Sequence, residues 1–128
     1  MKLTPIQKIE GEEFKANVTH KHDELVNLRL SQDVELTIAS GIITMSRNNH
    51  TVDTEADAAS DNLDTILGAN KGQMIILRAN NTARTVVIKN GTGNIYSGTD
   101  FSLDSDKDVW FGVYDGTNWL EITRSDNS

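Results

Sequence analysis

The sequence contains no cysteine, a single proline and few aromatic residues. Of its 128 residues, 5% are aromatic and 37% are hydrophobic. The absence of cysteine excludes a disulfide framework, a thiolate zinc site and a cysteine nucleophile. The longest run of large apolar residues is Met74–Leu77, far shorter than the roughly 20 residues that a membrane-spanning helix needs. Residues 1–5 also lack the apolar core of a secretion signal.

Positive charge is also scarce in this chain. Twelve Lys and Arg residues stand against 19 Asp and Glu residues, which gives a net charge of -7 and a pI of about 4.8. An acidic protein repels nucleic acid and anionic lipid at long range, and the basic residues here are scattered singly. We therefore expect neither a nucleic-acid partner nor a membrane partner.

The chain length suits one domain, preceded by a segment of different character. Residues 1–23 are expected to form an extended N-terminal arm, and residues 24–128 a β-domain. An arm of this kind gains order only by lying on its own domain or on a neighbour, and a disordered terminus is the alternative. The apolar residues of the arm are Ile6, Ile9, Phe14 and Val18.

From about residue 24 the apolar residues recur with a period of two, which indicates β-strands with one buried face. The stretch 73–78 is apolar throughout its centre and is expected to be buried on both faces. Residues 109–114 and 119–123 flank Asp115–Asn118 and should form an antiparallel hairpin. The predicted strands are 26–30, 34–38, 42–45, 50–54, 73–78, 84–88, 93–96, 100–103, 109–114 and 119–123.

Residues 55–68 are the best helical candidate in the sequence. Leu63, Ile66 and Leu67 have the spacing of one apolar helix face, and several alanines precede them. The expected fold is all-β: an antiparallel sandwich, a jelly roll or a small barrel, with one short helix and an extended N-terminal arm.

Two histidines of the arm are candidate metal ligands. In an extended segment His20 and His22 point to the same side. One chain supplies only two ligands, whereas a closed metal site needs about four. A trimer with this segment on its axis would supply six nitrogens, but exposed imidazoles are the favoured interpretation. We predict no metal and no cofactor.

Carboxylates are abundant, but they match no catalytic or metal-binding motif. Residues 104–108 begin like a calcium loop, yet Val109 stands where the loop needs glycine and Asp115 where it needs glutamate. Turn carboxylates that accept backbone hydrogen bonds are the favoured interpretation. No nucleophile elbow or phosphate loop occurs either, so the chain is not expected to be an enzyme.

Three aromatic residues near the end of the chain allow two interpretations. Trp110, Tyr114 and Trp119 could form a platform on which a sugar stacks, or an interface with another subunit. Packing in a core or interface is favoured, because indole is a large apolar group.

Several stretches between residues 40 and 127 resemble a module that is common in virion proteins of tailed phages. The resemblance implies an all-β structural module of tail fibres and head-decoration proteins, frequently trimeric, and it brings no catalytic residues. The stretches that carry it are Val52–Asp57, Asp61–Ile66, Ile76–Ala79, Ala83–Ile88, Gly91–Ile95, Tyr114–Ile122 and Arg124–Asn127.

Two functions follow from this resemblance. The first is a capsid decoration, or cement, protein that is made in the host cytoplasm, binds the major capsid protein as a homotrimer and stabilises the head at the outer capsid surface. The arm residues Ile6, Ile9, Phe14 and Val18 would then contact the capsid. The alternative is a tail-fibre or receptor-binding domain that recognises a bacterial surface glycan.

Overall fold

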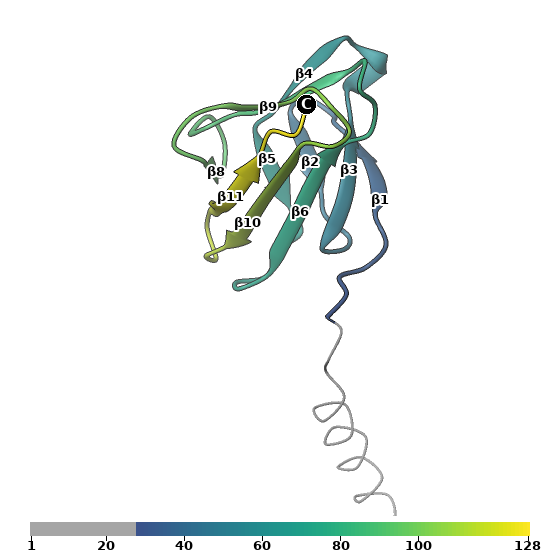
Figure 1. The fold of residues 1–128 in the computed structure, drawn as a ribbon. Helices are drawn as coiled ribbons and strands as arrows, with labels where there is room; N and C mark the ends of the chain where they lie inside the picture. Colours follow the sequence, from purple (N-terminus) through teal and green to yellow (C-terminus); the bar gives the residue numbers. More distant parts are fainter. Residues whose placement is uncertain (1–27) are drawn as a thin grey trace, which may run out of the picture.

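Short β-strands dominate the computed structural model of the protein, which describes residues 28–128 (Figure 1). One turn of 3-10 helix, η1 (Glu55–Asp57), is the only helical element in this range. The strands are β1 (Val34–Thr37), β2 (Ile42–Thr44), β3 (Asn49–Asp53), β4 (Ser60–Leu63), β5 (Thr65–Leu67), β6 (Met74–Ala79), β7 (Thr85–Ile88), β8 (Ile95–Tyr96), β9 (Phe101–Leu103), β10 (Val109–Tyr114) and β11 (Trp119–Ser125).

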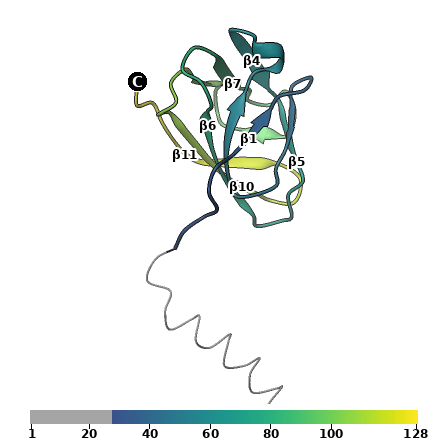
Figure 2. The same ribbon diagram turned by 90° about the vertical axis from the view of Figure 1, so that its right-hand side faces the viewer.

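The strands form one large sheet and two small ones. The large sheet has the order β1-β3-β6-β10-β11-β8, and the small sheets are β2-β5 and β4-β7-β9. Five of the eight strand pairs within the described residues are parallel, including β1-β3 and β3-β6. The chain thus returns repeatedly to the large sheet in the same direction, a stacking similar to that of a solenoid (Figures 1 and 2).

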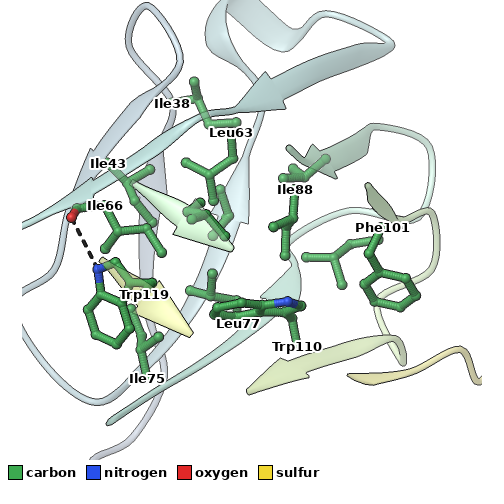
Figure 3. Close-up of a cluster of buried hydrophobic side chains, with 14 of the residues drawn as sticks. Ile38, Ile43, Leu63, Ile66, Ile75, Leu77, Ile88, Phe101, Trp110 and Trp119 are labelled. Carbon is green, nitrogen blue, oxygen red and sulfur yellow. Dashed lines mark hydrogen bonds between the residues drawn. The ribbon is translucent and has the colours of Figure 1, made fainter. Parts of the chain in front are cut away.

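The core lies between the large sheet and the two small ones (Figure 3). The large sheet contributes alternate residues of β6 and β10 together with Trp119 of β11, and the small sheets face them with their own alternate residues. Each fully buried aliphatic side chain contributes about 1.5–3 kcal/mol. The largest fully buried apolar residues are Trp110, Trp119, Ile38, Leu63, Ile66, Ile75, Leu77, Ile88, Ile95 and Leu103.

Most of the predicted strands are confirmed, within a residue or two at their ends. The pattern of alternating burial is clear in β6, where Ile75 and Leu77 are buried and their neighbours are not. The terminal hairpin is antiparallel, with Tyr114 opposite Trp119. The predicted strand 26–30 is not confirmed, because residues 28–30 form no strand and the others lie outside the described residues.

Residues 55–68 form no α-helix, so this part of the prediction is wrong. Only Glu55–Asp57 make a helical turn, and the chain then continues into β4 and β5. Leu63 and Ile66 are both buried, but each belongs to a strand that pairs with another strand. Their spacing fits one helix face as well as two short strands on either side of Asp64. Tertiary pairing decides between these two structures.

Of the expected architectures, the sandwich is supported, but the jelly roll and the antiparallel pairing are wrong. The structure is all-β and agrees with a sandwich, but parallel pairs and solenoid-like stacking predominate. A period of two shows that one face of a strand is buried and does not show the direction of its neighbour. Strand direction therefore could not follow from the pattern that revealed the strands.

Candidate functional site

The two tryptophans lie in the core and not on the surface. Trp110 and Trp119 are both 0% exposed. The indole N–H of Trp119 donates to the carbonyl oxygen of Ile66 at 3.2 Å (Figure 3). The indole N–H of Trp110 donates to Ser97 Oγ at 3.0 Å. Their polar atoms are thus satisfied inside the protein, as burial of an indole requires.

An exposed sugar platform made of Trp110, Tyr114 and Trp119 is therefore absent from the described structure. The ring of Tyr114 is half-buried and packs on Trp119, with 5.3 Å between ring centroids and an interplanar angle of 43°. Trp110 is opposite Arg124 in the hairpin, so the two indoles are not direct cross-strand partners. The two indole rings are therefore not available for stacking on a ligand, and Tyr114 packs against the core.

The carboxylates near residue 104 hold a turn and the end of the chain. Asp104, Asp108 and Asp126 each bring an oxygen to within 4.8 Å of the others. Asp108 is fully buried, and its Oδ2 accepts hydrogen bonds from the backbone of Asp104 and Ser105, both at 3.1 Å. Its Oδ1 accepts one from the Asn127 backbone at 2.7 Å. Backbone donors thus occupy both oxygens, which explains why this carboxylate can be buried.

A second buried carboxylate, which the sequence analysis did not single out, joins the two layers of the sandwich. Asp53, at the end of β3, is 6% exposed and accepts two hydrogen bonds from Arg84, at 2.7 and 2.8 Å. Its Oδ1 also accepts from the Thr54 backbone at 2.9 Å. The hydrogen bond from the guanidinium is the main reason that the pKa of Asp53 lies below its usual value of 3.8.

The loop between β7 and β9 is organised by one asparagine. The side chain of Asn90 accepts from the Ser97 backbone at 2.8 Å and donates to the Gly98 carbonyl at 3.2 Å. The Asn90 backbone donates to Asp100, which also pairs with Lys89. These two partners, the backbone N–H first, lower the pKa of Asp100 from its usual value. The loop therefore presents fixed polar groups to solvent.

Over β6, β8, β10 and β11, the side of the large sheet that faces away from the core carries neighbouring apolar residues. Tyr96 pairs with Leu120, Leu120 is opposite Val113, and Val113 is opposite Met74, so these four residues form one row across β8, β11, β10 and β6. Phe111 and Ile76 form the next pair on this side. We call this surface the outer apolar face, and its residues are Met74, Ile76, Tyr96, Phe111, Val113 and Leu120.

The candidate residues of the arm lie outside the described residues. They are Ile6, Ile9, Phe14, Val18, His20 and His22. Within residues 28–128 the surface has no cleft or cavity that would enclose a ligand. No helix in this range is long and apolar enough to cross a membrane.

Comparisons with known proteins give one match. The family model described as the phage depolymerase C-terminal beta sandwich domain matches residues 15–120, which is 106 of the 128 residues. The matched region begins inside the predicted arm and ends in β11. No curated protein and no solved structure matches the chain. The match and the all-β fold agree with a structural module of tailed-phage virions. The chain belongs to the family of phage depolymerase C-terminal beta sandwich domains.

Proposed function

We propose that this chain is a tail-fibre or receptor-binding module that recognises a bacterial surface glycan. The observation that carries the proposal is the family match over residues 15–120. A domain that is attached to a polymer-degrading protein is expected to work where the polymer is. A capsid decoration protein works on the head instead, so the family favours the tail over the capsid surface.

We expect this chain to bind a glycan without cleaving it. A glycan is held mainly by hydrogen bonds and by contact with open surfaces, and groups that are already fixed lose less entropy on binding. The loop around Asn90 provides such fixed groups, because its polar contacts hold residues 89–100 in one arrangement. In this proposal the chain binds its glycan and leaves cleavage to other parts of the virion.

A homotrimer would strengthen this binding. Three copies on one fibre present three equivalent sites, and each bound site raises the effective concentration of glycan at the other two. A weak single-site affinity is then sufficient for firm attachment to a cell surface. Sedimentation of the full chain, alone and with glycan, measures both the number of copies and their binding.

Binding to host cells tests the proposal. The full chain, labelled with a fluorophore, is incubated with host bacteria and with an otherwise identical strain that lacks surface polysaccharide. We expect saturable binding to the first strain and loss of binding to the second. Phage heads purified without tails are the control. Saturable binding to these heads, with no difference between the two strains, would contradict the proposal and favour capsid decoration.

A further inference from the structure

The outer apolar face lacks a covering layer in the described structure. Met74, Tyr96 and Leu120 are 37%, 49% and 41% exposed. Together with Val113 they form the row that crosses four neighbouring strands. Single exposed apolar residues are normal on protein surfaces, but a contiguous apolar surface usually marks a place where something binds.

The sequence of β6 supports the same conclusion. The run Met74–Leu77 is apolar at every position, a pattern typical of strands that are buried on both faces. The core covers Ile75 and Leu77 completely, whereas Met74 and Ile76 point to the other side and stay partly exposed. The sequence of β6 is therefore typical of a strand that is buried on both faces. Among residues 28–128, other residues pack on only one of these faces.

The chain enters the sheet beside this surface. The parallel strands β1, β3 and β6 start at the same end of the large sheet, because Val34 pairs with His50 and His50 with Leu77. Ser31 lies against the start of β3, where its carbonyl oxygen accepts a hydrogen bond from Asn49 Nδ2 at 3.1 Å. Asn49 is in turn the partner of Ile76, a residue of the outer apolar face. Ser31 thus lies next to the edge of this face.

We propose that residues 15–27 dock on the outer apolar face and complete the domain. The family match begins at residue 15, so these thirteen residues belong to the module although they precede the described part. They include Val18, Leu25 and Val26, which can pack on the exposed row. This inference concerns the build of the domain and does not depend on what the domain binds.

The length of this segment is sufficient. Thirteen residues in an extended conformation span at most about 47 Å. The outer apolar face extends from β6 to β8, and the neighbouring β3 adds one more spacing, which makes about 19 Å at roughly 4.8 Å per strand. The segment can therefore cross the whole face and still turn at Ser31.

Two polar atoms at the edge of this surface also lack partners. Ser31 Oγ and Asn49 Oδ1 are buried from solvent and make no hydrogen bond with the described residues. An unpartnered buried polar atom costs about 1–3 kcal/mol, so such atoms are normally paired. A backbone N–H of the arriving segment can supply a donor to these atoms.

Hydrogen exchange of the full chain tests the proposal. In the wild type we expect the amides of residues 15–27 to exchange at least about tenfold more slowly than in an unstructured chain. Leu120→Glu should abolish this protection, because it buries a charge under the segment. The matched control is Leu67→Glu, a similarly exposed leucine of β5 on another sheet, which should leave the protection unchanged.

Two results would overturn the proposal. One is random-coil exchange of residues 15–27 in the wild type. The other is protection that Leu120→Glu leaves unchanged while it converts an oligomer to a monomer in light scattering, since the face would then be an interface between copies. Tyr96→Ser is a second variant in case Leu120→Glu unfolds the domain, and the fluorescence of the buried tryptophans reports on folding in each variant.

A spin label distinguishes docking within one chain from docking on a neighbour. The protein has no cysteine, so Val18→Cys provides a single labelling site. We expect broadening of amides near Met74 and Leu120 and none near Val87, which lies in the β4-β7-β9 sheet. Mixing labelled chain with unlabelled, isotope-enriched chain shows the same broadening only if the segment docks on another copy. Broadening that is equal at all three positions contradicts the proposal.

Discussion

The guanidinium of Arg84 donates two hydrogen bonds to the carboxylate of Asp53, from Nε at 2.7 Å and from Nη2 at 2.8 Å. Asp53 ends β3 in the large sheet, and Arg84 precedes β7 in the β4-β7-β9 sheet. The two residues are 31 positions apart in sequence. This ion pair therefore connects the two layers of the sandwich beside the crossings of the chain from β3 to β4 and from β6 to β7.

Replacing the arginine of this pair should destabilise the domain. Arg84→Met leaves the buried carboxylate of Asp53 without its main partner, and an unpaired buried charge is strongly unfavourable. The matched control is Arg78→Met, which breaks a more exposed ion pair with Asp33. Urea unfolding should show a clear fall in midpoint for Arg84→Met and little change for Arg78→Met. Equal urea midpoints for the two variants would show that the Asp53–Arg84 pair does not contribute more to the stability of the fold than the exposed pair does.

The same pair makes stability depend on pH. The folded pKa of Asp53 is lower than its unfolded value of 3.8, mainly because of the hydrogen bond from Arg84. The pair therefore stabilises the fold above the unfolded pKa, and this contribution is lost as the pH falls through the folded pKa. Urea midpoints measured from pH 6 to pH 2 should fall less steeply below about pH 4 in Asp53→Asn than in the wild type.

Some acid sensitivity should remain in that variant. The pKa of Asp100 and that of Asp115 are also lowered, in both cases first by hydrogen bonds from backbone N–H groups. These carboxylates contribute in the same direction as Asp53. Identical pH profiles for Asp53→Asn and the wild type would mean that Asp53 is not a source of the dependence.

Trp119 should contribute to stability mainly through packing. In Trp119→Phe the smaller ring leaves a cavity, and unfolding should become easier by about 2 kcal/mol. The lost hydrogen bond matters less, because the Ile66 carbonyl keeps the Asn94 side chain as a donor at 2.9 Å. Tyr96→Phe, on the exposed side of the sheet, should change stability by less than about 0.5 kcal/mol. Calorimetry of both variants measures the difference, and similar values would contradict the core position of Trp119.

Two segments approach closely at Gly93, so this position has no room for a side chain. A Cβ at this position would overlap the carbonyl oxygen of Asp64 and the hydroxyl of Thr65. Gly93→Ala should therefore destabilise the domain by about 3 kcal/mol. Gly91→Ala is the control, because nothing lies within 4 Å of its Cβ and only its φ of 78° is unfavourable, which costs about 1 kcal/mol. Thermal unfolding should give this order, and the reverse order would show that the segments do not meet there.

The positions of the strands could be predicted from the sequence, but their directions could not. Alternation in β1, β3 and β7 revealed each strand, and Asp115–Asn118 revealed the hairpin that sets Tyr114 opposite Trp119. The same alternation suits parallel and antiparallel partners, so the solenoid-like stacking was hidden. The prediction of a helix at residues 55–68 was wrong because a three-residue spacing of buried side chains fits a helix and also two consecutive short strands.

The candidate site was harder to predict than the fold. The ion pair of Asp53 with Arg84 depends on the meeting of two segments, for which neither residue carries a local signal. Tryptophan is a residue type typical of sugar-binding platforms, so the sequence allowed that interpretation for both tryptophans. Only their positions in β10 and β11 show that they point into the core. The apolar run of β6 predicted burial on both faces, whereas Met74 and Ile76 stay partly exposed among residues 28–128.

Copy number in purified virions tests the proposed function most directly. Quantitative mass spectrometry compares this chain with the major capsid protein of the same particles. A tail-fibre or receptor-binding module should be present at far fewer copies than the capsid protein, because a virion has one tail and many capsid subunits. A copy number comparable with that of the capsid protein would contradict this account and establish decoration of the head.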